Sequence, residues 1–408
     1  MTSESTQLLQ KTIELEQHGT LAAERERLRV SFGPSYYQPT GCFIKKGEKF
    51  QVVLHETDQT LLPRIVISPA ILTEYKIAAN EGTELKVGEN EIEAPEGGIL
   101  YFINESTPTE LPAKVTISGG RSFPTFELGK TTVSEWEEQL KNCADAPVFE
   151  LLTSKVMITA GMNFAELVPD PTNILEAHDK VVELQAQLSG LSLDDEEIHQ
   201  PTKFRYHFRQ TKEPGYYMYA YFNHTAYSEE GMPFILDVNK FKNDGWGPWH
   251  ELGHVHQQTA WTPDMFVEVT VNLFSLTVQR YFGGNSRLEV DGVYDKAFAY
   301  LESEQKDFAN LDVWEKLVML WQLELAYGRS YYPSIFRMIR ETPISEIPKT
   351  DEERLQKIIL WTSKAAKQNL MPVFAKWGLT PTEEIKQQIL ELDLMELNQE
   401  VWKLRDDQ

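Results

Sequence analysis

The strongest constraint on the fold is the residue pattern, which changes from strand-like to mostly helical near residue 125. Between residues 31 and 125, short β-branched or alternating segments such as FQVVLHE, RIVISP and GGILYFI are separated by Gly, Pro and Asn. Short strands at such spacing are typical of two-layered β domains. The sequence therefore predicts a β-sandwich-like region over residues 31–125.

Helical patterns dominate the rest of the chain. A polar helical pattern covers residues 5–30, another helical pattern runs from 131 to 190, and helix follows helix from residue 248 onward. Between 203 and 240, GYYMYAYFNHTAY and PFILDV predict strands. We expect an α+β protein with a mostly helical C-terminal part. Its expected parts are an N-terminal helical arm (1–30), a β-sandwich-like domain (31–125), a central domain (126–340) and a C-terminal helical region (341–408).

Composition and charge exclude several classes of protein. The chain of 408 residues is 41 % hydrophobic and 25 % charged, which is the balance of a globular protein. A formal net charge of −23 opposes binding to nucleic acid or to anionic membrane surfaces. No apolar run has the length of a membrane span, so we expect no membrane insertion. The two cysteines, Cys42 and Cys143, do not form a disulfide framework.

The segment PWHELGHVHQQ, residues 248–258, carries the most specific chemistry in the chain. On a helix, His250 and His254 lie one turn apart on the same face, so both imidazoles can reach one metal ion about 2 Å away. Glu251 lies beside the metal, where its carboxylate can take a proton from metal-bound water. Gly253 leaves room beside the metal and costs roughly 1 kcal/mol of helix stability relative to Ala. The spacing predicts a zinc site with an adjacent base.

A catalytic zinc site needs a third protein ligand and one open position. A third histidine six residues after His254 is excluded, because that position is Ala260 and the expected glycine is Gln257. Asp264 is available, but it lies in TPDM, which has the pattern of a turn or helix cap. Glu268 lies in a long helix-compatible run, and ligands must converge from two elements. We therefore favour Glu268.

Two neighbouring residues need separate interpretations. Asn272 follows Glu268 by one helical turn, so it can orient a ligand histidine through the nitrogen that does not bind the metal. His256 is two residues past His254 and points to a different face of the helix. We expect His256 to lie outside the metal shell, as a surface histidine or behind the ligands.

The motif HELGHVHQ followed by EVTVNLF resembles that of the enhancin-like metallopeptidases. This gluzincin family includes viral enhancins and mucin-degrading peptidases, and its pattern is His-Glu-x-x-His, a variable spacer and then Glu. His250, His254 and Glu268 match its zinc ligands, and Glu251 matches its catalytic base. The segments YYQPTGCFIKKGEKFQVVL, EGGILYFINES, GMPFILD and LVMLWQLELAYGRSYYPSIFRMIRE are also similar, so the resemblance covers residues 30–345.

The resemblance implies a gluzincin, thermolysin-like catalytic domain over residues 126–340 that binds one Zn²⁺ ion. It further implies a zinc-dependent endopeptidase that cleaves polypeptides, in glycoproteins or mucin-type substrates, with Glu251 as general base. A secreted location would fit this family, although the first thirty residues contain no apolar core of signal-peptide length.

Aromatic residues near the motif are candidates for substrate contacts. The segment YYMYAYF, residues 216–222, can form an edge strand to which a peptide adds. A packed aromatic core is the other interpretation, and we favour it for most of the set. The candidates for substrate binding are Trp246, Trp249, Tyr219 and Tyr332. The candidates for stabilising the oxyanion are Tyr331, Tyr332 and His224.

Two other functions remain open. The first is a non-catalytic module that binds glycan or protein and holds a structural zinc ion. A structural site normally closes its fourth position and needs no adjacent carboxylate, so Glu251 favours an enzyme. The second is a cytosolic aminopeptidase of the same zinc class. It would need an acidic anchor for a free amino terminus, and the sequence has no clear Gly-x-Met-Glu-Asn segment.

Overall fold

The computed structural model describes residues 9–74 and 81–406, which group into two compact units. The first unit holds the described residues up to Arg25 together with Phe32–Asp179 and Thr202–Glu251. The second holds Glu26–Ser31, Lys180–Pro201 and the described residues from Leu252 onward. Within the described ranges, no helix is both long and apolar enough to cross a membrane.

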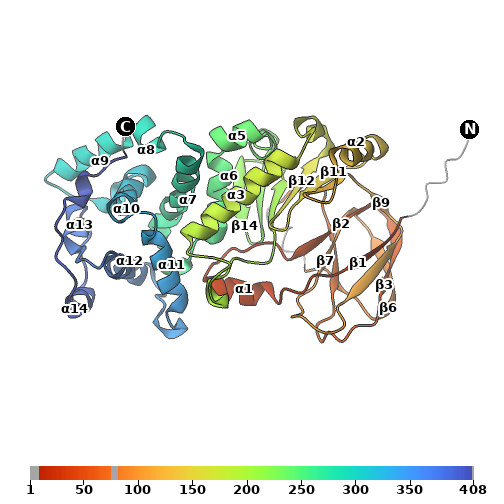
Figure 1. Cartoon of the computed structure of the whole chain (residues 1–408), viewed down its shortest axis with the longest axis horizontal. Helices are drawn as coiled ribbons and strands as arrows, with labels where there is room; N and C mark the ends of the chain where they lie inside the picture. Colours follow the sequence, from red (N-terminus) through yellow and green to blue (C-terminus); the bar gives the residue numbers. More distant parts are fainter. Residues whose placement is uncertain (1–8, 75–80, 407–408) are drawn as a thin grey trace, which may run out of the picture. The chain divides into compact units, whose positions relative to one another are not determined.

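A β-sandwich forms one part of the first unit (Figure 1). Its strands are β1 (Gln10–Glu14), β2 (Tyr37–Ile44), β3 (Glu48–Leu54), β4 (Arg64–Ser68), β5 (Thr83–Glu84), β6 (Gly88–Ala94), β7 (Gly98–Ile103), β8 (Lys114–Ser118) and β9 (Arg121–Ser122). One sheet has the order β1-β8-β3-β6 and the other has the order β5-β4-β7-β2-β9. The expectation of a β-rich N-terminal region is therefore confirmed.

The sandwich core follows from alternation along its strands. In β3, Phe50, Val52 and Leu54 are buried, while the residues between them are partly exposed. Leu100 and Phe102 of β7 belong to the same buried cluster, which joins the two sheets. Every second side chain of these strands thus points into the space between the two sheets and fills it, as the sequence pattern predicts.

The N-terminal arm differs from the predicted helix. Residues Gln10–Glu14 form β1, which pairs antiparallel with β8, and the helix α1 is confined to Leu21–Leu28. Leu9 and Ile13 pack against the sandwich core, and this tertiary contact outweighs the helical propensity of the segment. Residues 1–8 of the predicted arm lie outside the described residues.

A second sheet in the first unit, here called the central sheet, has the order β10-β11-β12-β13-β15-β14. Strand β14 lies at its edge and runs antiparallel to β15. Figure 1 shows α2 (Val133–Asn142) and α3 (Thr172–Leu188) near this sheet. The ring of His178 in α3 lies 4.7 Å from that of Phe208 in β13, so the start of α3 covers the sheet. The bounds are β10 (Thr125–Glu127), β11 (Val148–Leu152), β12 (Val156–Gly161), β13 (Tyr206–Gln210), β14 (Met218–Tyr221) and β15 (His224–Tyr227).

Two local predictions around the central sheet are wrong. The predicted helical stretch from 131 to 190 contains β11 and β12, which are buried at every position and therefore lack the alternation that marks a half-exposed strand. The segment PFILDV, predicted as a strand, forms α4 (Pro233–Leu236) and the start of α5 (Val238–Asn243). Pro233 occupies the first turn of α4, and Asp237 caps α5 by accepting bonds from two backbone N–H groups.

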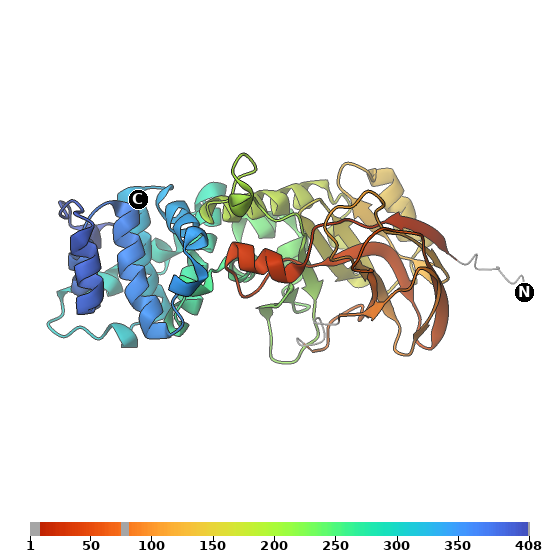
Figure 2. The ribbon, with the colours of Figure 1, turned by 90° about the horizontal axis from the view of Figure 1, so that it is seen from below.

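The second unit is helical, as the sequence predicts from residue 248 onward. Its helices are α7 (Val267–Phe282), α8 (Arg287–Val290), α9 (Val293–Glu302), α10 (Val313–Tyr327), α11 (Tyr331–Glu341), α12 (Asp351–Ala366), α13 (Met371–Lys376) and α14 (Glu383–Glu391). The helices drawn in blue in Figure 2 lie side by side, and α12 contacts α11, α13 and α14. Helix α7 ends at Gly283, which has a φ of +80° and so adopts the left-handed cap conformation that favours glycine.

Candidate metal centre

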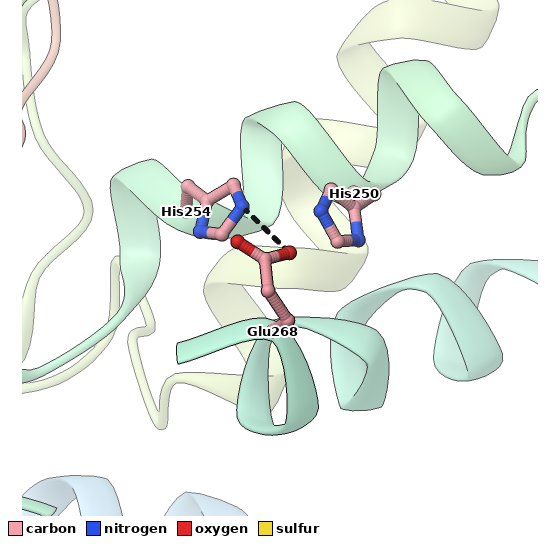
Figure 3. Close-up of side chains that lie close together, drawn as sticks. All are labelled: His250, His254 and Glu268. Carbon is pink, nitrogen blue, oxygen red and sulfur yellow. Dashed lines mark ion pairs between the residues drawn. The ribbon is translucent and has the colours of Figure 1, made fainter. Parts of the chain in front are cut away.

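Helix α6 (Trp246–His256) carries the His-Glu-x-x-His motif. Its two histidines, His250 and His254, lie on the face that meets the start of α7, where Glu268 stands in the first turn (Figure 3). One nitrogen of each histidine and one carboxylate oxygen of Glu268 all lie within 4.8 Å of one another. In the structure, the three donors that the sequence favoured for a metal are brought together.

The geometry of these donors fits a zinc ion. Ligand atoms about 2.1 Å from a tetrahedral zinc lie roughly 3.4 Å apart. Nε2 of His254 and Oε2 of Glu268 are 3.6 Å apart, close to that separation. The side chain of Glu268 is 56 % exposed, so it can rotate to close the remaining gap. Two imidazoles and one carboxylate are also the donor set of zinc sites that leave a position open.

Gly253 brings the two donor-bearing helices together. A Cβ atom at this position would lie 2.9 Å from Cγ2 and 3.1 Å from the backbone oxygen of Val271, and 3.2 Å from Cβ of Phe274. Any side chain at residue 253 would therefore push α7 away from α6. This contact is a packing reason for the glycine, while the interpretation that Gly253 also leaves room beside the metal stays a prediction.

Glu251 lies on α6 between the two histidines and is partly exposed, but it does not belong to the group of donors. Its charge acts on Tyr227 of β15. Burial raises the pKa of the Tyr227 phenol well above its usual range, and the nearby Glu251 carboxylate adds to the rise. The buried Tyr227 hydroxyl donates a hydrogen bond to Oγ1 of Thr225, 3.0 Å away. Sequence reasoning did not single out Tyr227, because the contact joins distant parts of the chain.

The hydrogen bonds behind the donors differ from the expected ones. Nδ1 of His254 lies 2.7 Å from Oε1 of Gln257, a residue that sequence reasoning used only to exclude another ligand scheme. Its position three residues after His254, directly past the last residue of α6, was the available signal. The side-chain amide of Asn272 donates to the backbone oxygen of Glu268 over 2.7 Å. The role of Asn272 toward a ligand histidine therefore stays a prediction.

The alternative residues near the motif lie elsewhere. Asp264 is exposed, and its backbone N–H donates to Asp351. His256 is outside the group of donors, but it is buried against Phe274 rather than at the surface. Burial lowers the pKa of His256 to about 3, so the ring is neutral at physiological pH. His256 thus acts as a core residue.

Most of the aromatic residues predicted to bind substrate are buried. Trp249 is 2 % exposed and Tyr332 is 0 % exposed, which leaves no surface to stack on a ligand. The Tyr332 hydroxyl donates to the backbone oxygen of Leu320 over 2.6 Å. Tyr219 is mainly buried against neighbouring rings, whereas Trp246 is partly exposed at the first residue of α6. Core packing, the interpretation favoured for most of these aromatic residues, is therefore correct for Trp249 and Tyr332.

The three oxyanion candidates are also internal. Tyr331 is buried and its hydroxyl donates to the backbone oxygen of Thr362, so both Tyr331 and Tyr332 are used in core hydrogen bonds. His224 is buried in the central sheet, and burial lowers its pKa to about 3. These groups do not fit the role of an oxyanion donor, because a donor must reach the substrate.

Two imidazoles and a carboxylate on consecutive helices, with a further glutamate beside the first histidine, are the residues that define a metallopeptidase domain. The chain belongs to the family Peptidase M60, enhancin and enhancin-like, whose model matches residues 119–378. The model of the N-terminal domain of M60-like peptidases matches residues 20–118. The resemblance read from the motif is thereby confirmed.

The chain is also similar to individual proteins of known sequence or structure. Human TRPM8 channel-associated factor 2 is 25 % identical over 359 residues, which cover 85 % of this chain and 36 % of that protein. The chain therefore spans about a third of the length of this curated relative. A functionally unknown conserved protein from Bacillus anthracis str. Ames is 36 % identical, with a TM-score of 0.90 over 98 % of this chain and 82 % of that chain.

The fold is shared with the M60 catalytic domain of ZmpC from Clostridium perfringens, solved in complex with the sialyl T antigen. The TM-score is 0.80 at 21 % identity, and the match covers 96 % of this chain and 81 % of that chain. At this identity the likeness concerns the fold alone.

Proposed function

We propose that the protein is a zinc-dependent endopeptidase that hydrolyses peptide bonds in glycosylated proteins. The convergence of His250, His254 and Glu268 carries the proposal, because these donors leave room for a further ligand on the ion. The proposal includes one zinc ion and a thermolysin-like arrangement of the catalytic domain over residues 126–340.

Each group of the chain has a distinct task in this mechanism. When bound, zinc supplies Lewis-acid activation of a water molecule and of the scissile carbonyl group. His250 and His254 offer neutral nitrogen donors, and the carboxylate of Glu268 offsets part of the charge of the ion. Glu251 accepts a proton from the attacking water on its carboxylate and then delivers it to the nitrogen of the leaving amine.

The central sheet offers a place for the polypeptide. Strand β14 lies at the sheet edge, and an extended peptide can add there as a further strand through backbone hydrogen bonds. Just before β14, Tyr216 is 44 % exposed and Tyr217 is 51 % exposed, so both rings can contact a bound chain or its sugars. These tyrosines replace Trp249 and Tyr332 as the proposed contacts.

A glycosylated substrate is proposed by analogy of fold. The ZmpC catalytic domain, which shares the fold, was solved with the sialyl T antigen. Partly exposed aromatic rings such as that of Trp246 are the kind of surface on which sugar rings stack. The test of peptidase activity uses a mucin-type glycoprotein, so it also addresses whether a glycosylated protein is a substrate.

The proposal is tested by zinc analysis and proteolysis with two variants. We expect the wild-type protein to hold about one equivalent of zinc and to cleave a mucin-type glycoprotein. Glu251→Gln should retain zinc while its activity falls roughly 100-fold or more, because it removes the general base. Glu268→Ala should lose zinc. Undiminished cleavage by Glu251→Gln would overturn the catalytic assignment.

A second candidate function is a non-catalytic binding protein with a structural zinc ion. The human relative is named as a channel-associated factor, which describes that protein as a partner of another molecule. Under this alternative, the wild-type protein would bind zinc but leave both mucin and casein intact, and Glu251→Gln would match it in both assays.

A further inference from the structure

Gln257 is held by three hydrogen bonds that join both donor-bearing helices. Its Oε1 lies 2.7 Å from Nδ1 of His254. Its Nε2 lies 2.6 Å from the backbone oxygen of Val267 and 2.8 Å from Oγ1 of Thr270, both in the first turn of α7. The side chain is 7 % exposed, so water competes little for these bonds.

The direction of every bond in this group is determined by the surrounding atoms. The backbone oxygen of Val267 can only accept, so the amide atom that meets it must be the NH₂ group of Gln257. The Thr270 hydroxyl donates to the backbone oxygen of Phe266, 3.1 Å away, which leaves its oxygen to accept from the same NH₂ group. The oxygen of the Gln257 amide therefore faces His254.

This direction determines the tautomer of His254. An amide oxygen only accepts, so Nδ1 of His254 must carry a hydrogen. A neutral imidazole carries one such hydrogen, so Nε2 is then the nitrogen that has the lone pair. Nε2 is also the atom that lies 3.6 Å from Oε2 of Glu268, on the side where the donors converge.

We propose that Gln257 is a positioning residue that fixes the tautomer and ring orientation of His254 before a metal ion arrives. The same amide binds the backbone of Val267, the residue before Glu268, so it also fixes the first turn of α7 relative to α6. Gln257 thus fixes the position of His254 relative to the helical turn that carries Glu268. The inference rests on the proposed zinc site, and its evidence is the set of hydrogen bonds that Gln257 makes.

The adjacent residue Gln258 provides a matched control. It is also buried, and its Nε2 donates to the backbone oxygens of Leu28 and Phe336, each 3.1 Å away. Replacing either glutamine with methionine removes buried hydrogen bonds at similar side-chain volume. Among the described contacts, only those of Gln257 reach a donor histidine, so a purely structural role would affect both variants alike.

The first measurement is zinc affinity by competition with a chromophoric chelator. Loss of a partner that orients a ligand histidine typically lowers metal affinity 10–100-fold. We expect a loss of roughly this size for Gln257→Met and a change within about threefold for Gln258→Met. Equal affinities for the two variants would overturn the proposal. If Gln257→Met does not fold, Thr270→Val removes one anchor of the amide and should weaken zinc binding in the same direction.

The second measurement is ¹⁵N NMR of the histidine rings in the metal-free proteins. His254 should be the Nδ1–H tautomer in the wild-type protein and in Gln258→Met, and should shift toward the Nε2–H tautomer in Gln257→Met. A His254 tautomer that is the same in all three proteins would contradict the proposal. If the wild-type protein binds no zinc, the proposed function fails, whereas the tautomer measurement still decides on Gln257.

Discussion

Gly253 shows how packing and chemistry meet at a single residue. The absence of a side chain lets α7 approach α6, because a Cβ atom would lie within 3.2 Å of three atoms of Val271 and Phe274. Glu268 is carried by the same α7, so its distance from His254 depends on this contact. The glycine supports the metal site through the helix spacing.

Replacing Gly253 with alanine should therefore weaken both the fold and the metal site. Alanine gains roughly 1 kcal/mol of helix propensity, but overpacking costs roughly 1–3 kcal/mol. We expect a net loss of about 1 kcal/mol in the free energy of unfolding in urea, with weaker zinc binding. Gly284→Ala is the control, because a Cβ there would meet mainly the flexible side chain of Gln279. Equal zinc affinity in both variants would contradict this explanation.

Glu150 in β11 is a buried carboxyl group away from the metal centre. Its Oε1 accepts hydrogen bonds from the hydroxyls of Tyr101 and Thr159. Burial raises the pKa of Glu150 from 4.5 to about 7, although these two bonds oppose the rise. The folded protein therefore keeps a proton on Glu150 at pH values where the unfolded chain has lost it.

The stability of the first unit should depend on pH through Glu150. Between pH 4.5 and 7 the folded state binds the additional proton, so stability is highest below this window and falls as the pH rises through it. The full loss is roughly 3 kcal/mol. Glu150→Gln cannot ionise, so its unfolding free energy in urea should lack this fall. Identical pH dependence of the two proteins would show that Glu150 does not titrate here.

Sequence reasoning found the three candidate donors that the structure brings together, but it found few of the residues around them. His250 and His254 follow from helix geometry alone, and Glu268 follows from the need for a ligand on a second element. Gln257 was missed because its role depends on contacts with α7 that local spacing does not contain. Trp249 and Tyr332 were only candidates for substrate contact, because large aromatic side chains suit both a core and a binding surface.

At the scale of elements, burial explains which predictions failed. Half-exposed strands such as β3 alternate and were recognised, whereas β11 and β12 are buried on both faces and have the continuous apolar pattern of either a strand or a buried helix. Strand β1 owes its conformation to pairing with β8, a contact about a hundred residues away in the chain. The division at residues 125 and 340 stays a proposal.

Helix α10 offers a test of element stability. Its N-cap Asp312 accepts bonds from the N–H groups of Trp314 and Glu315, and the Glu315 carboxylate accepts from the N–H of Asp312. Asp312→Ala should lower the free energy of unfolding by about 1 kcal/mol, because it removes this capping box. Asp312→Asn keeps a capping oxygen and should stay within a few tenths of the wild-type value. Equal losses for both variants in urea unfolding would exclude capping as the cause.

For the whole molecule, the net charge of −23 sets the conditions for the proposed substrates. Sialylated glycoproteins are anionic, so long-range repulsion should slow their encounter with the protein. Salt screens this repulsion, and at 0.1 M the screening length is only about 10 Å. We expect kcat/KM for a sialylated glycopeptide to rise between 20 and 200 mM NaCl (about 20 and 7 Å of screening length), and to rise less for its desialylated form. Equal salt dependence of the two substrates would show that the net charge does not act at the site.

The position of β14 at the edge of the central sheet also bears on self-association. A strand edge that can receive a peptide can equally receive the same edge of another copy, which is the first step of aggregation. Copies that each carry a formal charge of −23 repel one another before their strands can pair. The acidity that opposes anionic substrates should therefore also oppose pairing of two copies through this edge.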